Sequence, residues 1–60
     1  MKLWEFSGKQ VKITCITGEV FVGIAYDYTP PQDNEPEIAS ISVGDYEIYE
    51  NEIKSIELTA

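Results

Sequence analysis

The stretch that decides the fold is Val20-Phe21-Val22-Gly23-Ile24-Ala25-Tyr26-Asp27-Tyr28. β-Branched and aromatic residues dominate it, which predicts a strand. The strand is apolar on both faces up to its aspartate: one face holds Phe21, Gly23 and Ala25, and the other holds Val20, Val22, Ile24 and Tyr26. A glycine inside a long strand often marks the bend at which a small barrel closes. We therefore expect a strand that bends at Gly23, within an all-β fold.

Four further segments have the composition and alternation of strands, at residues 11–17, 37–43, 46–49 and 53–58. The pair Gly44-Asp45 is a hairpin signal of the kind that opens with glycine. Residues 50–52 are too few for an α-helix and too polar for a strand, so they predict one 3₁₀ turn before the last strand. The sequence therefore predicts five strands.

Two segments stand outside this pattern. Residues 29–37 contain three prolines and no periodicity, which predicts the one long loop. Residues 3–6, Leu-Trp-Glu-Phe, are compatible with a short strand or with a helical turn, although their large apolar side chains must be covered.

The chain has 60 residues, enough for a single domain over residues 1–60. A domain of this size buries only about 60% of the surface of its unfolded chain, so the core is thin. Cys15 is the only cysteine and histidine is absent, which excludes an internal disulfide and leaves a zinc site without its usual ligands. We expect no metal and no cofactor, and stability from regular packing or self-association.

The charge balance bears on partners and on the compartment. Eleven carboxylates and four lysines give a net charge of −7. Non-specific affinity for nucleic acid comes largely from Lys and Arg that replace counterions on phosphates, so this charge disfavours nucleic acid. A lone cysteine fits a reducing compartment, and no stretch resembles a signal peptide or a long apolar span. We expect a cytoplasmic protein with no membrane partner.

Five short strands with a bent, glycine-bearing second strand describe a small SH3-like barrel. Gly18-Glu19-Val20-Phe21-Val22-Gly23 resembles the first signature of Sm-like proteins, in which a turn glycine precedes an aromatic residue and a second glycine. Ile48-Tyr49-Glu50-Asn51-Glu52-Ile53 resembles the second signature. Over residues 8–58 the chain is similar to the Sm-like (LSm) family, as a divergent, bacterial-type member. The resemblance implies a five-stranded, strongly bent antiparallel barrel of Sm-like type.

The chain departs from the family where Sm-like proteins bind RNA. Asp27 lies two residues closer to Gly23 than the family spacing, and residues 28–31, Tyr-Thr-Pro-Pro, replace an asparagine-bearing loop. Glu50-Asn51 occupies the positions of the family's Arg-Gly pair, and a carboxylate there repels phosphate. The family's N-terminal helix is missing or reduced to residues 3–6. We expect the family's fold without its RNA-binding site.

No catalytic constellation is visible, so we expect no enzyme. Cys15 has no histidine to activate it and alternates with Val11 and Ile13, which predicts a buried core thiol. Carboxylates alternate along the long loop and offer oxygen ligands to a cation such as calcium. Their spacing matches no calcium loop, so a solvated, charged loop is the favoured interpretation of Asp33, Glu35 and Glu37.

The apolar second face of residues 20–28, together with Ile38, Tyr49 and Ile53, exceeds what one small core readily covers. In Sm-like barrels the fourth strand of one subunit pairs with the fifth strand of the next, and self-association would cover the surplus. The alternative is a monomer whose barrel bend absorbs both faces. The candidate interface consists of Tyr46, Ile48, Tyr49, Ile53, Ile56 and Leu58.

A second candidate surface could receive a ligand. Aromatic rings form shelves for proline-rich peptides or for bases, although they equally cover the open ends of small barrels. The residues of this surface are Tyr26, Asp27, Tyr28 and Asn51.

Three functions follow from these features. The first is a non-catalytic binding or assembly module of Sm-like fold that mediates protein–protein or homo-oligomeric contacts. The alternative is residual binding of RNA or single-stranded nucleic acid, through Lys9, Lys12 and Lys54 with the tyrosines. A weaker alternative is an acidic inhibitor that mimics nucleic acid.

Overall fold

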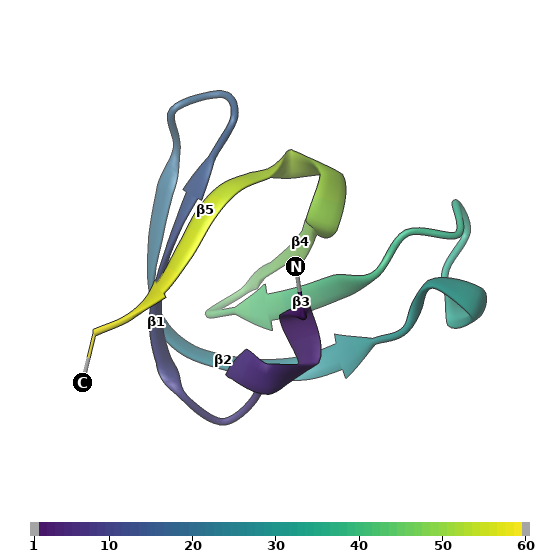
Figure 1. Ribbon diagram of the computed structural model, residues 1–60, viewed down its shortest axis with the longest axis horizontal. Helices are drawn as coiled ribbons and strands as arrows, with labels where there is room; N and C mark the ends of the chain where they lie inside the picture. The colour runs from purple at the N-terminus through teal and green to yellow at the C-terminus, as the bar shows by residue number, and fades with distance from the viewer. Residues whose placement is uncertain (1, 60) are drawn as a thin grey trace.

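The computed structural model describes residues 2–59 as a five-stranded antiparallel sheet with the strand order β4-β3-β2-β1-β5 (Figure 1). The strands are β1 (Gln10–Cys15), β2 (Val20–Thr29), β3 (Ser40–Val43), β4 (Tyr46–Tyr49) and β5 (Ile53–Leu58). Three 3₁₀ turns accompany them, η1 (Leu3–Phe6), η2 (Pro31–Asp33) and η3 (Glu50–Glu52). No helix within the described residues is long and apolar enough to cross a membrane.

Strand β2 belongs to both halves of the sheet. Its first half pairs with β1, from Val20 opposite Thr14 to Ile24 opposite Gln10. Its second half pairs with β3, beginning with Ala25 opposite Val43. Figure 1 shows β2 turning from the upright layer on the left into the lower layer. The expected change of direction therefore lies beside Gly23.

The close approach of two strands explains why a glycine stands at this point. A Cβ atom added to Gly23 would lie 3.2 Å from Cγ1 of Val43 on β3. That separation is tighter than ordinary van der Waals contact, so a Cβ atom here would require the Val43 side chain to shift by a few tenths of an ångström.

The sheet is open rather than closed. Strands β4 and β5 are its two edges, and no pairing joins them across residues 2–59. The prediction of an all-β fold with five antiparallel strands is confirmed, as are the 3₁₀ turn before β5 and the turn at Gly44-Asp45. Residues 3–6, which the sequence left as either a short strand or a helical turn, form a 3₁₀ turn.

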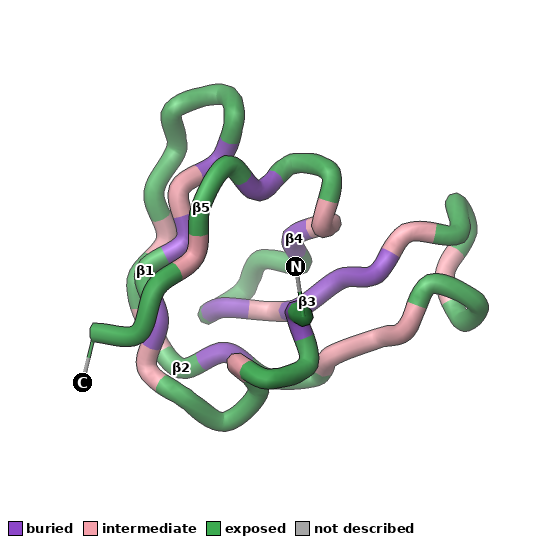
Figure 2. The backbone as a smooth tube through the Cα atoms, in the orientation of Figure 1, coloured by how far each residue is buried: buried purple, intermediate pink, exposed green. Residues whose placement is uncertain are grey.

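The core lies between the two halves of the sheet, where Figure 2 shows the buried segments facing each other. Complete burial of an aliphatic side chain contributes about 1.5–3 kcal/mol to folding. Leu3 of η1 is buried and adds one large side chain from outside the sheet. The buried apolar residues are Leu3, Val11, Ile13, Cys15, Ala25, Ala39, Ile41, Val43, Ile48 and Ile53.

Two predicted strand boundaries are wrong by more than one residue, because backbone groups there form hydrogen bonds outside the ladders. β1 stops at Cys15 rather than Thr17, since the N–H of Ile16 donates to the carbonyl of Glu52 at 2.9 Å. β3 begins at Ser40 rather than Glu37. The N–H of Ile38 donates to the carbonyl of Pro36 at 2.8 Å, so the loop uses this backbone group locally.

Asp27 interrupts the regular alternation of β2. Its φ of 55° lies in the left-handed region, which is uncommon for residues other than glycine. The pairing of β2 with β3 shifts register between Tyr26 and Thr29, so Asp27 forms part of a bulge. The side chains on either side of Asp27 therefore meet different surroundings.

Candidate interaction surfaces

The first candidate surface lies on the two edges of the sheet. Tyr46 begins β4 and is 60% exposed, and Leu58 ends β5 and is 56% exposed. Tyr49 and Ile56 are partly buried. Ile48 and Ile53 are buried and belong to the core of a single copy. The exposed apolar area of each edge therefore lies at one end of the strand, and we call Tyr46 and Leu58 the edge anchors.

Tyr46 is held in place by an aromatic neighbour. Its ring centroid lies 5.0 Å from that of Phe21, with an angle of 49° between the planes. Phe21 is partly buried and packs against the core. Tyr46 therefore presents one side to the core and leaves the other free.

The residues of the second candidate surface make separate contacts. The hydroxyl of Tyr26 donates to the carbonyl of Gly44, in the turn between β3 and β4. Tyr28 is partly buried and meets the ring of Trp4 edge-on at 6.3 Å. Asp27 is exposed at the bulge between them, and Asn51 is exposed on η3. Among residues 2–59 no side-chain hydrogen bond joins Asn51 to the other three residues.

The apolar surplus predicted for residues 20–28 is present at the surface. Val20, Val22 and Ile24 are 50%, 60% and 51% exposed on the outer face of β2. We call these three residues the β2 stripe. Their partners across the β1 ladder are Thr14, Lys12 and Gln10, which are polar. The monomer interpretation required the bend of β2 to bury both apolar faces. The structure instead leaves the second face exposed.

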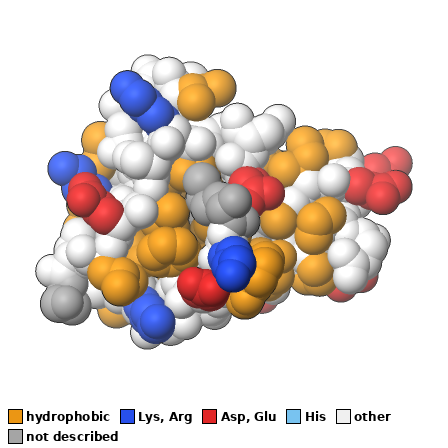
Figure 3. All heavy atoms as spheres, in the orientation of Figure 1, with side chains coloured by type: hydrophobic (Ala, Val, Ile, Leu, Met, Phe, Trp, Pro, Cys, Tyr) orange, Lys and Arg blue, Asp and Glu red, His pale blue; other side chains and the backbone are white. Residues whose placement is uncertain are grey.

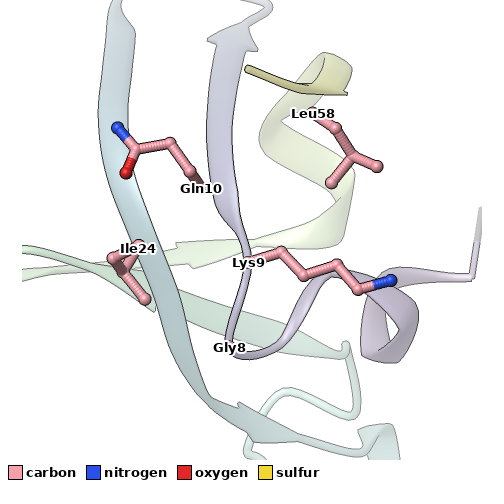
Figure 4. Close-up of a pocket in the computed structure, with 5 residues that line it drawn as sticks. All are labelled: Gly8, Lys9, Gln10, Ile24 and Leu58. Carbon is pink, nitrogen blue, oxygen red and sulfur yellow. The ribbon is translucent and has the colours of Figure 1, made fainter. Parts of the chain in front are cut away.

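A shallow groove extends the β2 stripe toward β5. It has a volume of about 410 Å³ and is lined by Gly8, Lys9, Gln10, Ile24 and Leu58. Figure 4 shows the side chains of Ile24 and Leu58 on opposite sides of the segment that carries Gly8 to Gln10. The sequence alone does not predict this groove, because the groove joins segments far apart along the chain. Only the apolar character of Ile24 and Leu58 signals it.

Cys15 lies at a smaller hollow of about 190 Å³, together with Glu19, Phe21, Tyr46 and Glu52 among others. Burial raises the pKa of the Cys15 thiol, and the carboxylates of Glu19 and Glu52 raise it further. The thiol is therefore protonated at neutral pH and a poor nucleophile. The prediction of a buried core thiol is confirmed.

The carboxylates of the acidic loop do not form a metal-binding cluster among the described residues. Asp33, Glu35 and Glu37 are exposed. In the described part of the chain, no three His, Cys, Asp or Glu side chains come together in a metal-binding arrangement. In Figure 3 acidic side chains gather at the right-hand tip, over the loop between β2 and β3, while hydrophobic side chains reach the middle of the face.

A hydrogen-bond chain connects this loop to β4. The Nδ2 of Asn34 donates to the carbonyl of Ile38 at 2.8 Å and to the Oγ of Ser40 at 3.0 Å. The hydroxyl of Ser40, which is fully buried, donates in turn to Oε2 of Glu47 at 2.8 Å. The sequence alone does not predict these hydrogen bonds, because the three side chains come from a loop and two strands.

Comparison of the chain with models of known protein families, with curated proteins and with solved structures finds no match. The functional inference therefore depends on the chain's own residues. Its starting points are the edge anchors, the β2 stripe and the groove between them.

Proposed function

We propose that the chain is a non-catalytic binding or assembly module, built as a small Sm-like barrel of SH3-like type. It associates through the edges of its sheet with further copies of itself or with another protein. The strand order β4-β3-β2-β1-β5 and the position of η3 directly before β5 support this proposal, because they agree with the sequence signatures that resemble the family.

The observation that carries the proposal is the pair of free edges. An unpaired edge presents a row of N–H and C=O groups that can pair with another chain. β4 and β5 are such edges, and each carries an exposed edge anchor, Tyr46 or Leu58. Pairing β4 of one copy with β5 of the next satisfies both edges and repeats head to tail, which closes a ring when the rotation allows it.

The edge anchors meet if this pairing is antiparallel. Tyr46 is the first residue of β4 and Leu58 is the last residue of β5, so antiparallel strands bring them to the same end of the interface. Contact between them removes from water the two most exposed apolar side chains of the edges. Aromatic and aliphatic side chains of this kind commonly carry much of the energy of an interface.

The test is the molar mass in solution, by light scattering on a sizing column over a wide range of concentration. We expect a multimer of the 6.8 kDa chain, which Tyr46→Asp or Leu58→Glu reduces. Ile16→Glu is a matched control, because Ile16 is an aliphatic residue 66% exposed in the turn between β1 and β2. The proposal fails for self-association if the wild-type chain stays a monomer or if the edge variants keep its mass.

The nucleic-acid alternative predicts a different response. Binding through lysines weakens steeply as salt rises. A titration with single-stranded RNA at low salt therefore separates the two: binding that Tyr46→Asp leaves unchanged but that is lost in Lys12→Ala would favour nucleic acid over edge pairing.

A further inference from the structure

The first half of β2 is an edge in its own right. Val20 to Ile24 pair with β1 on one side, whereas the pairing with β3 begins only at Ala25. β3 is four residues long and turns back at Gly44-Asp45, so it does not reach this part of β2. Within residues 2–59, the five residues Val20 to Ile24 therefore have a strand on one side only.

The direction of the backbone groups follows from the ladder. The N–H of Cys15 donates to the carbonyl of Glu19 at 2.8 Å, and the N–H of Ala25 donates to the carbonyl of Lys9 at 2.9 Å. The backbone groups of residues 19 and 25 thus point toward β1. Successive residues of a strand direct their backbone N–H and C=O groups to alternate sides. The N–H and C=O groups of Val20 and Val22 therefore point away from β1, toward the open side.

The side chains of this edge are apolar and uncharged. The β2 stripe is at least half exposed, and residues 20–26 contain no charged side chain, although the chain holds 15 in its 60 residues. Natural edge strands are usually protected by a charged residue, a proline or a bulge. Here the bulge at Asp27 lies beyond the exposed segment, so nothing in residues 20–24 opposes pairing.

We propose that two copies of the chain pair antiparallel through the first halves of their β2 strands, about a two-fold axis at Val22. In such a pair Val22 lies opposite Val22 of the second copy, and Val20 lies opposite Ile24. A charged side chain at position 22 would lie directly opposite its own copy, and the segment has no charged side chain. The outward residues are all β-branched, and side chains of this kind pack well on the pleated surface of a sheet.

The second copy is the occupant that this symmetry favours. Antiparallel pairing of a segment with itself needs no second surface, since the same residues serve on both sides. It joins the two stripes into one apolar band and the two three-stranded halves β2-β1-β5 into one continuous sheet. The β4 and β5 edges take no part, so this interface is independent of the proposed function and doubles whatever assembly those edges form.

Net charge gives the interface a characteristic salt dependence. Each copy carries −7, so two copies repel one another at low ionic strength. Salt screens this repulsion, with a Debye length that falls from about 30 Å at 0.01 M to about 10 Å at 0.1 M. Pairing through an uncharged edge therefore strengthens as salt is added, whereas association between opposite charges or with nucleic acid weakens.

The first test is light scattering on Val22→Lys, with Thr14→Lys as the matched control. Thr14 is opposite Val20 on the central strand β1, both of whose sides are already paired, and the two variants change the charge equally. We expect Val22→Lys to halve the molar mass of the wild-type assembly and Thr14→Lys to preserve it. The proposal is overturned if Val22→Lys keeps the wild-type mass at high salt, or if the wild-type chain is monomeric there.

Failure of this interface can be distinguished from failure of the edge pairing. Leu58→Glu acts on the β5 edge and changes no residue of β2. If both proposals hold, Leu58→Glu yields a dimer, while Val22→Lys yields the assembly formed by the β4 and β5 edges. A Leu58→Glu chain that is monomeric at high salt overturns the β2 pairing alone. A wild-type chain that stops at the dimer supports the β2 pairing and counts against the edge pairing.

A second measurement reports on the pairing itself. The amides of Val20 and Val22 point to the open side, so they exchange rapidly with solvent in the monomer and are protected in the dimer. Hydrogen exchange followed by NMR should show protection of these two amides that grows with protein concentration, with little change at Phe21. Concentration-independent exchange at Val20 and Val22 overturns the proposal, whatever the molar mass.

Discussion

The ring of Phe21 on β2 lies 5.0 Å from the ring of Tyr46 on β4, so an aromatic pair connects two strands that are not neighbours in the sheet. Phe21 belongs to the half of the sheet that contains β1 and β5, whereas Tyr46 belongs to the half that contains β3. The pair therefore brings side chains from the two halves of the sheet into contact.

The aromatic pair should contribute measurably to stability. Tilted aromatic pairs contribute about 0.5–1.5 kcal/mol beyond the area they bury. A double-mutant cycle of Phe21→Leu and Tyr46→Leu, measured by urea unfolding under monomeric conditions, should give a coupling energy in this range. A coupling near zero would mean that the two rings are neighbours without a specific interaction.

Gly23→Ala should destabilise the fold through Val43. The added Cβ would lie 3.2 Å from Cγ1 of Val43, and overpacking of this kind costs about 1–3 kcal/mol. Val43→Ala removes the obstructing methyl groups, so the cost of Gly23→Ala should shrink in that background. Urea unfolding of both single variants and the double variant measures the difference. Equal costs in the two backgrounds would contradict the steric explanation.

Stability should fall at alkaline pH because of Cys15. The folded state raises the pKa of this thiol above its ordinary value of 9.0, so folding favours the protonated form. The contribution is fully present below pH 9.0 and is lost as the pH rises above it toward the folded-state pKa, because only the unfolded chain then releases its proton. Cys15→Ala should show a shallower alkaline decline in unfolding free energy, and identical slopes would refute the assignment.

The same thiol should react slowly in the folded chain. Alkylation by iodoacetamide requires the exposed thiolate, and Cys15 is buried and protonated at neutral pH. Addition of urea past the unfolding transition should restore the rate expected of a free cysteine. A rate that is already fast without urea would show that the hollow beside Glu19 and Glu52 admits the reagent.

The left-handed backbone at position 27 should discriminate between side chains. Asp and Asn tolerate this region, whereas a β-branched residue is strained by about 1–2 kcal/mol. Asp27→Val should therefore lower the unfolding free energy by roughly this amount. Asp27→Asn is the control and should leave stability nearly unchanged. A large loss in Asp27→Asn would indicate that the charge, rather than the backbone, governs this position.

The local signals in the sequence were sufficient for most of the fold. The alternation of Val11, Ile13 and Cys15 predicted which side chains of β1 are buried, and the glycine at position 44 predicted the hairpin. These features depend on a few consecutive residues, so a pattern along the chain reports them directly. The two apolar faces of β2 were also evident, although the sequence did not decide whether the second would be covered.

The features that the sequence did not predict are those that depend on distant partners. The end of β1 depends on Glu52, which accepts a hydrogen bond from Ile16. The groove needs Gly8 and Leu58 to meet, and the unpaired half of β2 results from how short β3 is. No local pattern encodes such distances, because each follows from how segments pack once the sheet has formed.

The hydrogen-bond chain from Asn34 through Ser40 to Glu47 has a consequence for how this protein can change over evolutionary time. The Ser40 hydroxyl has a single proton, which it gives to Glu47, so it meets Asn34 as an acceptor. Replacing the serine with alanine removes both links at once, so Glu47 loses its bond to this chain while Asn34 keeps its bond to the carbonyl of Ile38. Natural variants are therefore expected to retain the three positions as a set or to lose them as a set.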